Sequence, residues 1–149
     1  MTLENKTREL SGCMHVVMTE AHRHDKKLMA VFNTLAPQEF HVMMTVGHTG
    51  GCIMSDIAGT VQLSLSSITG IVDKLEVKHI VRRDRSVEDR RSVRVILTDE
   101  GRKVYKTAMD GHLEFVRNLL GTLEPHEQDM LLSLFRKIAG VVKSRKGQG

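Results

Sequence analysis

The residues with most chemical potential lie in an arginine-rich stretch from Arg82 to Gly101, RRDRSVEDRRSVRVILTDEG. Between Arg82 and Arg94, six of thirteen residues are arginine and three are carboxylates. Guanidinium groups make bidentate contacts with phosphate and enter narrow minor grooves. The alternative is a solvated, charge-mixed hairpin whose charges protect a sheet edge from aggregation. The stretch taken alone leaves both interpretations open.

Short runs with the alternation of β-strands flank these arginines. Residues 80–83 precede the charged segment and residues 93–97 follow it. In the second run Val93, Val95 and Leu97 point to one face. The pattern predicts a two-stranded hairpin that carries guanidinium groups at its tip and edges.

A helix with small polar side chains is predicted directly upstream. The pattern indicates a short helix over 55–61, then a helix over 65–78 with Ser64 as its N-cap. One face of the second helix is apolar and consists of Ile68, Ile71, Val72 and Leu75. The opposite face carries mostly small or polar residues: Ser66, Ser67, Thr69, Gly70, Asp73 and Lys74. An ordinary amphipathic helix is the alternative. The succession of short helix, turn, small-polar helix and arginine hairpin favours a winged helix-turn-helix that binds duplex DNA.

Longer helical segments surround this lobe. We expect one domain of 149 residues, mainly α with a small β-hairpin wing (α+β). Its predicted parts are a winged helix-turn-helix lobe over 36–98, a connecting helix over 99–120, and dimerisation helices over 5–35 and 121–146. Because the terminal helices carry apolar stripes that need a partner, we expect a homodimer.

Composition narrows the class of protein. A net charge of +4 permits binding to a polyanion without requiring it. Two cysteines make no disulfide framework, and no zinc-site spacing, signal peptide or membrane span is found, so a cytoplasmic location without membrane contact is expected. No phosphate loop or nucleophile–base pair appears, so we expect neither an enzyme nor a cofactor. A winged helix that binds only proteins is a further alternative, which the arginines disfavour.

Several motifs together resemble the multiple-antibiotic-resistance-regulator (MarR) family of winged-helix transcription factors. They are Leu-Ser-Leu-Ser-Ser-Ile-Thr at 63–69, Val-Asp-Lys-Leu-Glu at 72–76, Arg-Arg at 82–83, Asp-Arg-Arg-Ser at 89–92 and Leu-Thr-Asp-Glu-Gly at 97–101. The resemblance covers nearly the whole chain. It implies an obligate homodimer that binds a pseudo-palindromic operator, as a repressor in our interpretation, and is released by a small-molecule effector.

The resemblance also implies which residues meet DNA. Residues 64–74 would form the recognition helix, and Asp89 would brace Arg91 in the minor groove. Arg85 and Arg90 would meet phosphates. The expected DNA-binding set is Ser64, Ser66, Ser67, Thr69, Gly70, Lys74, Arg85, Asp89, Arg90 and Arg91.

Two positions depart from the family pattern. Gly70 stands where many relatives carry a basic side chain, so base readout is expected to depend more on the wing. Ala36 replaces the usual Ser or Thr cap before Pro37, which would cost that helix about 1 kcal/mol.

Three kinds of effector remain open. Four methionines are candidates to line a pocket for a small organic anion or a lipophilic aromatic: Met14, Met18, Met43 and Met44. Methionines at such positions more often belong to the hydrophobic core. Cys13 is a candidate oxidant sensor, but Tyr105 is the only tyrosine that could polarise its thiol, and a buried structural cysteine is the alternative. His41 with His112 is a conceivable metal pair, but the histidine spacing does not fix two ligands on one face, so no metal site is expected.

Overall fold

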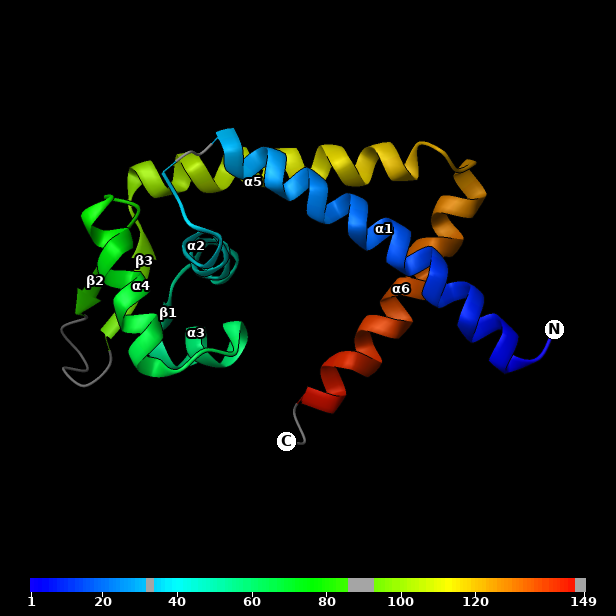
Figure 1. Cartoon of the computed structure of the whole chain (residues 1–149), viewed down its shortest axis with the longest axis horizontal. Helices are drawn as coiled ribbons and strands as arrows, with labels where there is room; N and C mark the ends of the chain where they lie inside the picture. Colours follow the sequence, from blue (N-terminus) through cyan, green and yellow to red (C-terminus); the bar gives the residue numbers. More distant parts are fainter. Residues whose placement is uncertain (32–33, 86–92, 147–149) are drawn as a thin grey trace. The chain divides into compact units, whose positions relative to one another are not determined.

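The computed structural model describes residues 1–31, 34–85 and 93–146, in which helices dominate (Figure 1). It has two compact units, Met1–His112 and Leu113–Gly149. The elements are α1 (Leu3–Val31), α2 (Pro37–Thr49), β1 (Cys52–Ile53), α3 (Met54–Val61), α4 (Leu65–Val77), β2 (Val81–Arg85), β3 (Val93–Leu97), α5 (Asp99–Leu120) and α6 (Pro125–Lys146).

The core of the first unit lies between α2, α3, α4 and a small antiparallel sheet. Its fully buried members come from all of these elements: Val42, Met43, Val46, Ile57, Ile68, Val72, Leu75 and Val95. The sheet order is β1-β3-β2, and β2 pairs with β3 from Val81↔Leu97 to Arg85↔Val93. This is the winged helix-turn-helix, mainly α with a small β-wing, that the sequence predicts.

The sheet has one strand more than the two-stranded hairpin predicted from the sequence. Cys52 pairs with Val95 and Ile53 with Arg94, which makes β1 the third strand. Two residues are too few to show the alternation by which strands are recognised. The pairing with β3 buries Cys52, in agreement with a structural role for this cysteine.

The end of the first helix also differs from the predicted end at residue 35. Residues 34–36 are not helical, and Leu35 packs into the core of the lobe instead of extending the first helix. The residue before a proline is driven out of the α region, and Ala36 has φ −69° and ψ 157°. The second helix, α2, ends at Thr49, and Gly50 after it adopts the left-handed conformation at φ 69°.

Inside the first unit, α1 packs against α5 through a close approach. A Cβ added at Gly111 would lie 2.6 Å from the Leu28 Cδ2 atom, so glycine lets the two helices meet. In the second unit, Gln128 Nε2 donates to the carbonyl oxygens of Leu120 (3.1 Å) and Leu123 (2.9 Å), which holds the turn between α5 and α6.

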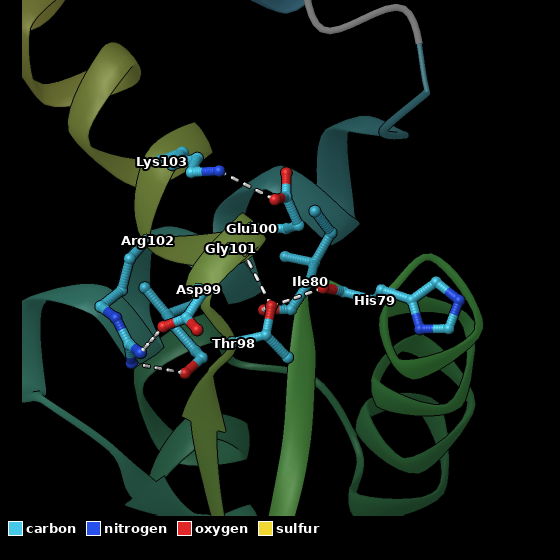
Figure 2. Close-up of polar contacts among 9 residues, drawn as sticks. His79, Ile80, Thr98, Asp99, Glu100, Gly101, Arg102 and Lys103 are labelled. Carbon is cyan, nitrogen blue, oxygen red and sulfur yellow. Dashed lines mark hydrogen bonds and ion pairs between the residues drawn. The ribbon is translucent and has the colours of Figure 1, made fainter.

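The junction between the wing and α5 depends on a threonine and a glycine (Figure 2). Thr98 Oγ1 donates to the His79 carbonyl oxygen, and it accepts from the Gly101 amide at 3.0 Å as the N-cap of α5. The Thr98 amide donates to the Ile80 carbonyl oxygen at 3.0 Å. A Cβ at Gly101 would overlap that same oxygen at a distance that no real Cβ atom tolerates. The Leu-Thr-x-x-Gly motif is therefore a close-packing motif.

A partly buried ion pair fastens α2 to the end of α4. The Glu39 carboxylate accepts hydrogen bonds from Lys78 Nζ and, at 2.9 Å, from the Ala36 amide, which is the bond that the third helical residue makes in a capping box. The bond that a Ser or Thr side chain at position 36 would accept is not made. Lys78 Nζ also donates to the Thr34 carbonyl oxygen. Burial raises the pKa of Glu39, but the bonds from Lys78 and Ala36 and the charge of Lys74 outweigh it, so the pKa lies below its ordinary value.

We predict that Gly101→Ala destabilises the lobe by roughly 1–3 kcal/mol or more, because the added methyl must displace backbone. Gly59→Ala in α3 is the matched control, since a Cβ there meets nothing within 4 Å. The control should be neutral or stabilising by up to about 1 kcal/mol. Urea unfolding followed by circular dichroism measures both, and equal effects of the two substitutions would contradict the close-packing role.

We predict that Glu39→Gln lowers stability at neutral pH by about 1–2 kcal/mol, because the bonds to a charged group are lost. A lowered folded-state pKa gives stability that is present above the ordinary pKa of about 4.5 and is lost as the pH falls below it. Thermal unfolding between pH 7 and pH 3 should therefore show the difference between wild type and variant shrinking toward acid. Glu100→Gln, which removes an exposed pair with Lys103, should change stability little at any pH. A Glu39→Gln deficit that stays constant with pH would refute the ionic role.

Candidate nucleic-acid interface

The second helix of the helix-turn-helix, α4, is capped and oriented by its own sequence. Ser64 Oγ accepts from the Ser67 amide at 3.2 Å, as predicted for the N-cap. The buried residues of α4 are the four predicted for the inward face: Ile68, Ile71, Val72 and Leu75. Because this face is fixed in the core, the opposite face is turned outward.

The outward face of α4 carries small polar groups. All residues predicted to meet DNA from this region are exposed: Ser64, Ser66, Ser67, Thr69, Gly70 and Lys74. Thr69 Oγ1 donates to the Leu65 carbonyl oxygen at 2.9 Å, and Ser64 Oγ donates to Ser67 Oγ at 2.8 Å. These hydroxyls therefore keep free acceptor positions, which amino groups on base edges could use.

Gly70 lies at the middle of this outward face. A Cβ added there would meet nothing within 4 Å, so packing in the lobe does not require glycine. The position leaves a flat stretch of helix where a side chain could otherwise reach a base or a phosphate.

The described arginines of the wing have different environments. Arg82 and Arg85 are exposed, and Arg82 Nη1 only approaches Asp84 Oδ1 at 4.0 Å. Arg94 Nη2 donates to the Gly51 carbonyl oxygen at 2.8 Å. Asp89, Arg90 and Arg91, at the predicted tip, lie outside the described residues, so their roles stay predictions.

Arg83 is held against α4 by two carboxylates. Its Nη2 donates to Asp73 Oδ1 at 2.7 Å and its Nη1 to Glu76 Oε2, while its backbone amide donates to Glu76 Oε1 at 3.0 Å. The bond to Asp73 and the charges of both carboxylates raise the pKa of Arg83 above its ordinary value despite burial, so it is always charged. The arginine count of the sequence did not reveal this inward use.

The predicted effector residues lie in different places. Met14 and Met18 are exposed on α1 and line a shallow hollow there, whereas Met43 is fully buried in the lobe and Met44 packs against its core. Cys13 is exposed on α1 in the single chain, so its role as a buried structural cysteine or as an oxidant sensor stays a prediction. Within residues 1–31, 34–85 and 93–146, no three His, Cys, Asp or Glu side chains could hold a metal ion together.

A hollow of about 350 Å³ between α2, β3 and α5 was not found by sequence reasoning. Its walls are mostly apolar or glycine, with one guanidinium: Val46, Gly47, Gly50, Ile96, Leu97, Arg102 and Tyr105. Tyr105 Oη lies 3.0 Å from His48 Nδ1. Arg102 Nη1 donates to the Leu97 carbonyl oxygen at 3.0 Å, and its Nη2 forms an exposed ion pair with Asp99 (Figure 2). Residues 46–50 and 96–105 are far apart in the chain, so no local motif signals the cavity.

Comparisons with known proteins agree with this geometry. Residues 35–93 match the model of the MarR family. The "uncharacterized HTH-type transcriptional regulator YfiV" of Bacillus subtilis is 35% identical over 85% of this chain and 78% of its own length. The "HTH-type transcriptional repressor MdtR" of the same organism is 25% identical over 76% of this chain and 74% of its own length.

Solved structures show the same fold. A MarR family protein from Bacillus stearothermophilus superposes with a TM-score of 0.84 at 17% identity, covering 96% of this chain and 99% of its own. Within the part of the chain that the structure describes, no helix is long and apolar enough to cross a membrane. The family and these relatives are regulators of transcription and not enzymes. The chain thus belongs to the MarR family of winged helix-turn-helix, DNA-binding transcriptional regulators.

Proposed function

We propose that the protein is a homodimeric repressor that places α4 in the major groove and the wing in the minor groove of each operator half-site. The observation that carries this proposal is the exposed face of α4, which presents Ser66, Ser67, Thr69 and Lys74 beside a wing strand fastened to the same helix. A protein seated on a promoter in this way excludes other proteins from it. The relative MdtR is a transcriptional repressor by name, which supports repression.

Exposed apolar side chains support the proposed dimer. On α1 these include Leu10, Met14, Val17 and Met18, and on α6 they are Met130, Leu132, Leu134, Phe135, Ile138, Val141 and Val142. So many large apolar groups exposed along two helices mark an interaction surface. A second copy of the chain would cover them.

We therefore expect a dimer at micromolar concentration in sedimentation, with an interface above about 2,000 Å². Phe135→Glu should produce monomers and weaken operator binding, because it places a charge in the apolar interface. Glu127→Gln, near the start of α6, serves as a charge-changing control. A monomeric wild type that still binds operator tightly would refute the dimer.

For the wing, we expect Arg91→Ala to weaken operator binding by about 1–3 kcal/mol and to relax the preference for A·T base pairs in the groove it enters. Arg85→Ala should weaken all duplexes alike and lower the salt dependence by about one unit of slope. Titrations of duplexes at several salt concentrations measure both effects. Asp89→Ala should resemble Arg91→Ala in part if Asp89 orients that guanidinium. Tighter binding by Asp89→Ala would mean that net charge alone governs the wing.

We also propose that a small organic anion with an apolar body releases the protein from DNA. The hollow between α2, β3 and α5 supports this proposal, because it offers apolar walls, the Tyr105 ring and the Arg102 guanidinium. The wall formed by Ile96 and Leu97 belongs to β3, so an occupant touches a wing strand. The exposed methionines of α1 remain a second candidate lining.

We expect a panel of aromatic carboxylates to release operator DNA from the wild type, with a coupling of about 1–3 kcal/mol. Arg102→Gln should weaken this response by about tenfold, because a charge-assisted contact is lost. Lys103→Gln, the adjacent exposed cation, should not weaken it. Cys13→Ser should respond like wild type. If Cys13→Ser abolishes a release caused by peroxide, and carboxylates release nothing, the oxidant-sensor alternative replaces this one.

A further inference from the structure

Arg83 bridges the recognition helix and the wing through both its side chain and its backbone. Its guanidinium contacts Asp73 and Glu76 on α4, and its amide donates to Glu76 Oε1 at 3.0 Å. Glu76 thus holds the strand itself as well as the side chain that projects from it. The Arg83 side chain is only 25% exposed, so much of its surface is used by these contacts.

The bridge is needed because β2 is an edge strand. In the order β1-β3-β2 it pairs with β3, and among the residues that the structure describes no strand pairs with its other edge. The Arg83 amide points to that outer edge, where Glu76 accepts its hydrogen bond in place of a further strand. The contacts of Arg83 with the carboxylates of Asp73 and Glu76, together with the apolar core beneath the strand, therefore set the position of β2 relative to α4.

Arg82 provides a contrast at the adjacent position. Successive side chains of a strand point to opposite faces, and Arg82 is turned to solvent with 59% of its side chain exposed. Among the described residues, the carboxylate oxygen in reach of it is Asp84 Oδ1, at 4.0 Å from Arg82 Nη1. The two arginines carry the same charge on the same strand, but only Arg83 has an oriented pair of partners on α4.

We propose that Arg83 is a positioning residue for DNA recognition: it fixes the wing relative to α4, so that major-groove and minor-groove contacts are made at one spacing. This inference rests on the proposed DNA-binding mode of α4 and the wing. Arg83 itself does not contact phosphate, because its Nη atoms are directed at Asp73 and Glu76. A planar guanidinium can hold two carboxylates in fixed directions, which an ammonium group cannot do.

The two carboxylates support a positioning role over a role in affinity. Asp73 lies on the outward face of α4, where a negative charge repels the phosphates of bound DNA. By charge alone, its removal should tighten binding to every duplex. If it anchors Arg83, its removal should instead loosen the wing and reduce discrimination between duplexes. The two views therefore predict opposite signs for one substitution.

The experiment begins with selection of tight-binding 30-base-pair duplexes from a random pool by the full-length protein. The A·T-rich tract of the selected site is then shifted by one and by two base pairs relative to the bases read by α4. Affinities for the selected, shifted and unrelated duplexes are measured for the wild type and for Arg83→Gln, Arg83→Lys, Asp73→Asn and Arg82→Gln. Salt dependence is recorded for each, and unfolding curves establish that each variant is folded.

We expect Arg83→Gln to bind the selected duplex about tenfold more weakly than the wild type does. The difference in affinity between the selected and the shifted duplexes should largely disappear, and the salt dependence of binding should not change. Arg83→Lys should behave similarly, because charge without the planar fork does not position the strand. Asp73→Asn should lose part of the spacing preference without gaining affinity for the selected site. Arg82→Gln should keep the full preference and change only the general affinity for duplex.

Other outcomes would overturn the proposal in distinct ways. Equal losses on all duplexes and a salt slope lowered by about one for Arg83→Gln would make Arg83 a phosphate contact. Tighter binding by Asp73→Asn with full spacing preference would show that its charge alone matters. If Arg83→Gln does not fold, Asp73→Asn, which keeps the Glu76 pair, decides the question by its sign. Failure of the wild type to select any duplex would instead refute the proposed function.

Discussion

The carbonyl oxygen of Ile80 is the point at which the recognition helix, the wing and the connecting helix meet. The Ile80 amide closes the end of α4 by donating to the Leu75 carbonyl oxygen at 2.9 Å, and the next residue begins β2. The Ile80 oxygen then accepts from the Thr98 amide at 3.0 Å and lies against the bare backbone of Gly101. Because α4, β2 and α5 are all anchored close to this one atom, a displacement of any of the three elements also displaces the other two.

Much of this arrangement could be predicted because local rules govern it. The inward face of α4 follows from helical periodicity, and the caps Ser64 and Thr98 from the residue types that satisfy free amides. Features that depend on distant partners were missed. The two-residue strand β1 exists only through its pairing with β3. The Glu39 carboxylate that accepts from the Ala36 amide is held by Lys78, which is thirty-nine residues away in the chain.

The arginines show most clearly where sequence reasoning stops. By composition Arg82, Arg83, Arg85 and Arg94 are equivalent cations in one basic segment. In the fold, two of them are directed at the protein: Arg83 at carboxylates on α4, and Arg94 at the Gly51 carbonyl oxygen. Strand alternation predicts that neighbours point to opposite faces, but which face carries an acceptor depends on the packing of α4 and β1 against the sheet. Counting charge therefore overstates the charge available to DNA.

On the proposed scheme, the hollow and the DNA-binding surface share one structural member. Ile96 and Leu97 of β3 line the cavity, β3 pairs with β2, and β2 is tied through Arg83 to α4. A ligand shifts such a system only by binding one arrangement of these strands more tightly than the other. A flexible wing would absorb a shift of β3 within itself. When the wing is fastened to α4, a shift of β3 also moves the recognition helix. The contact of Arg83 with α4 would therefore both increase the specificity of DNA recognition and allow an effector to release the protein from DNA.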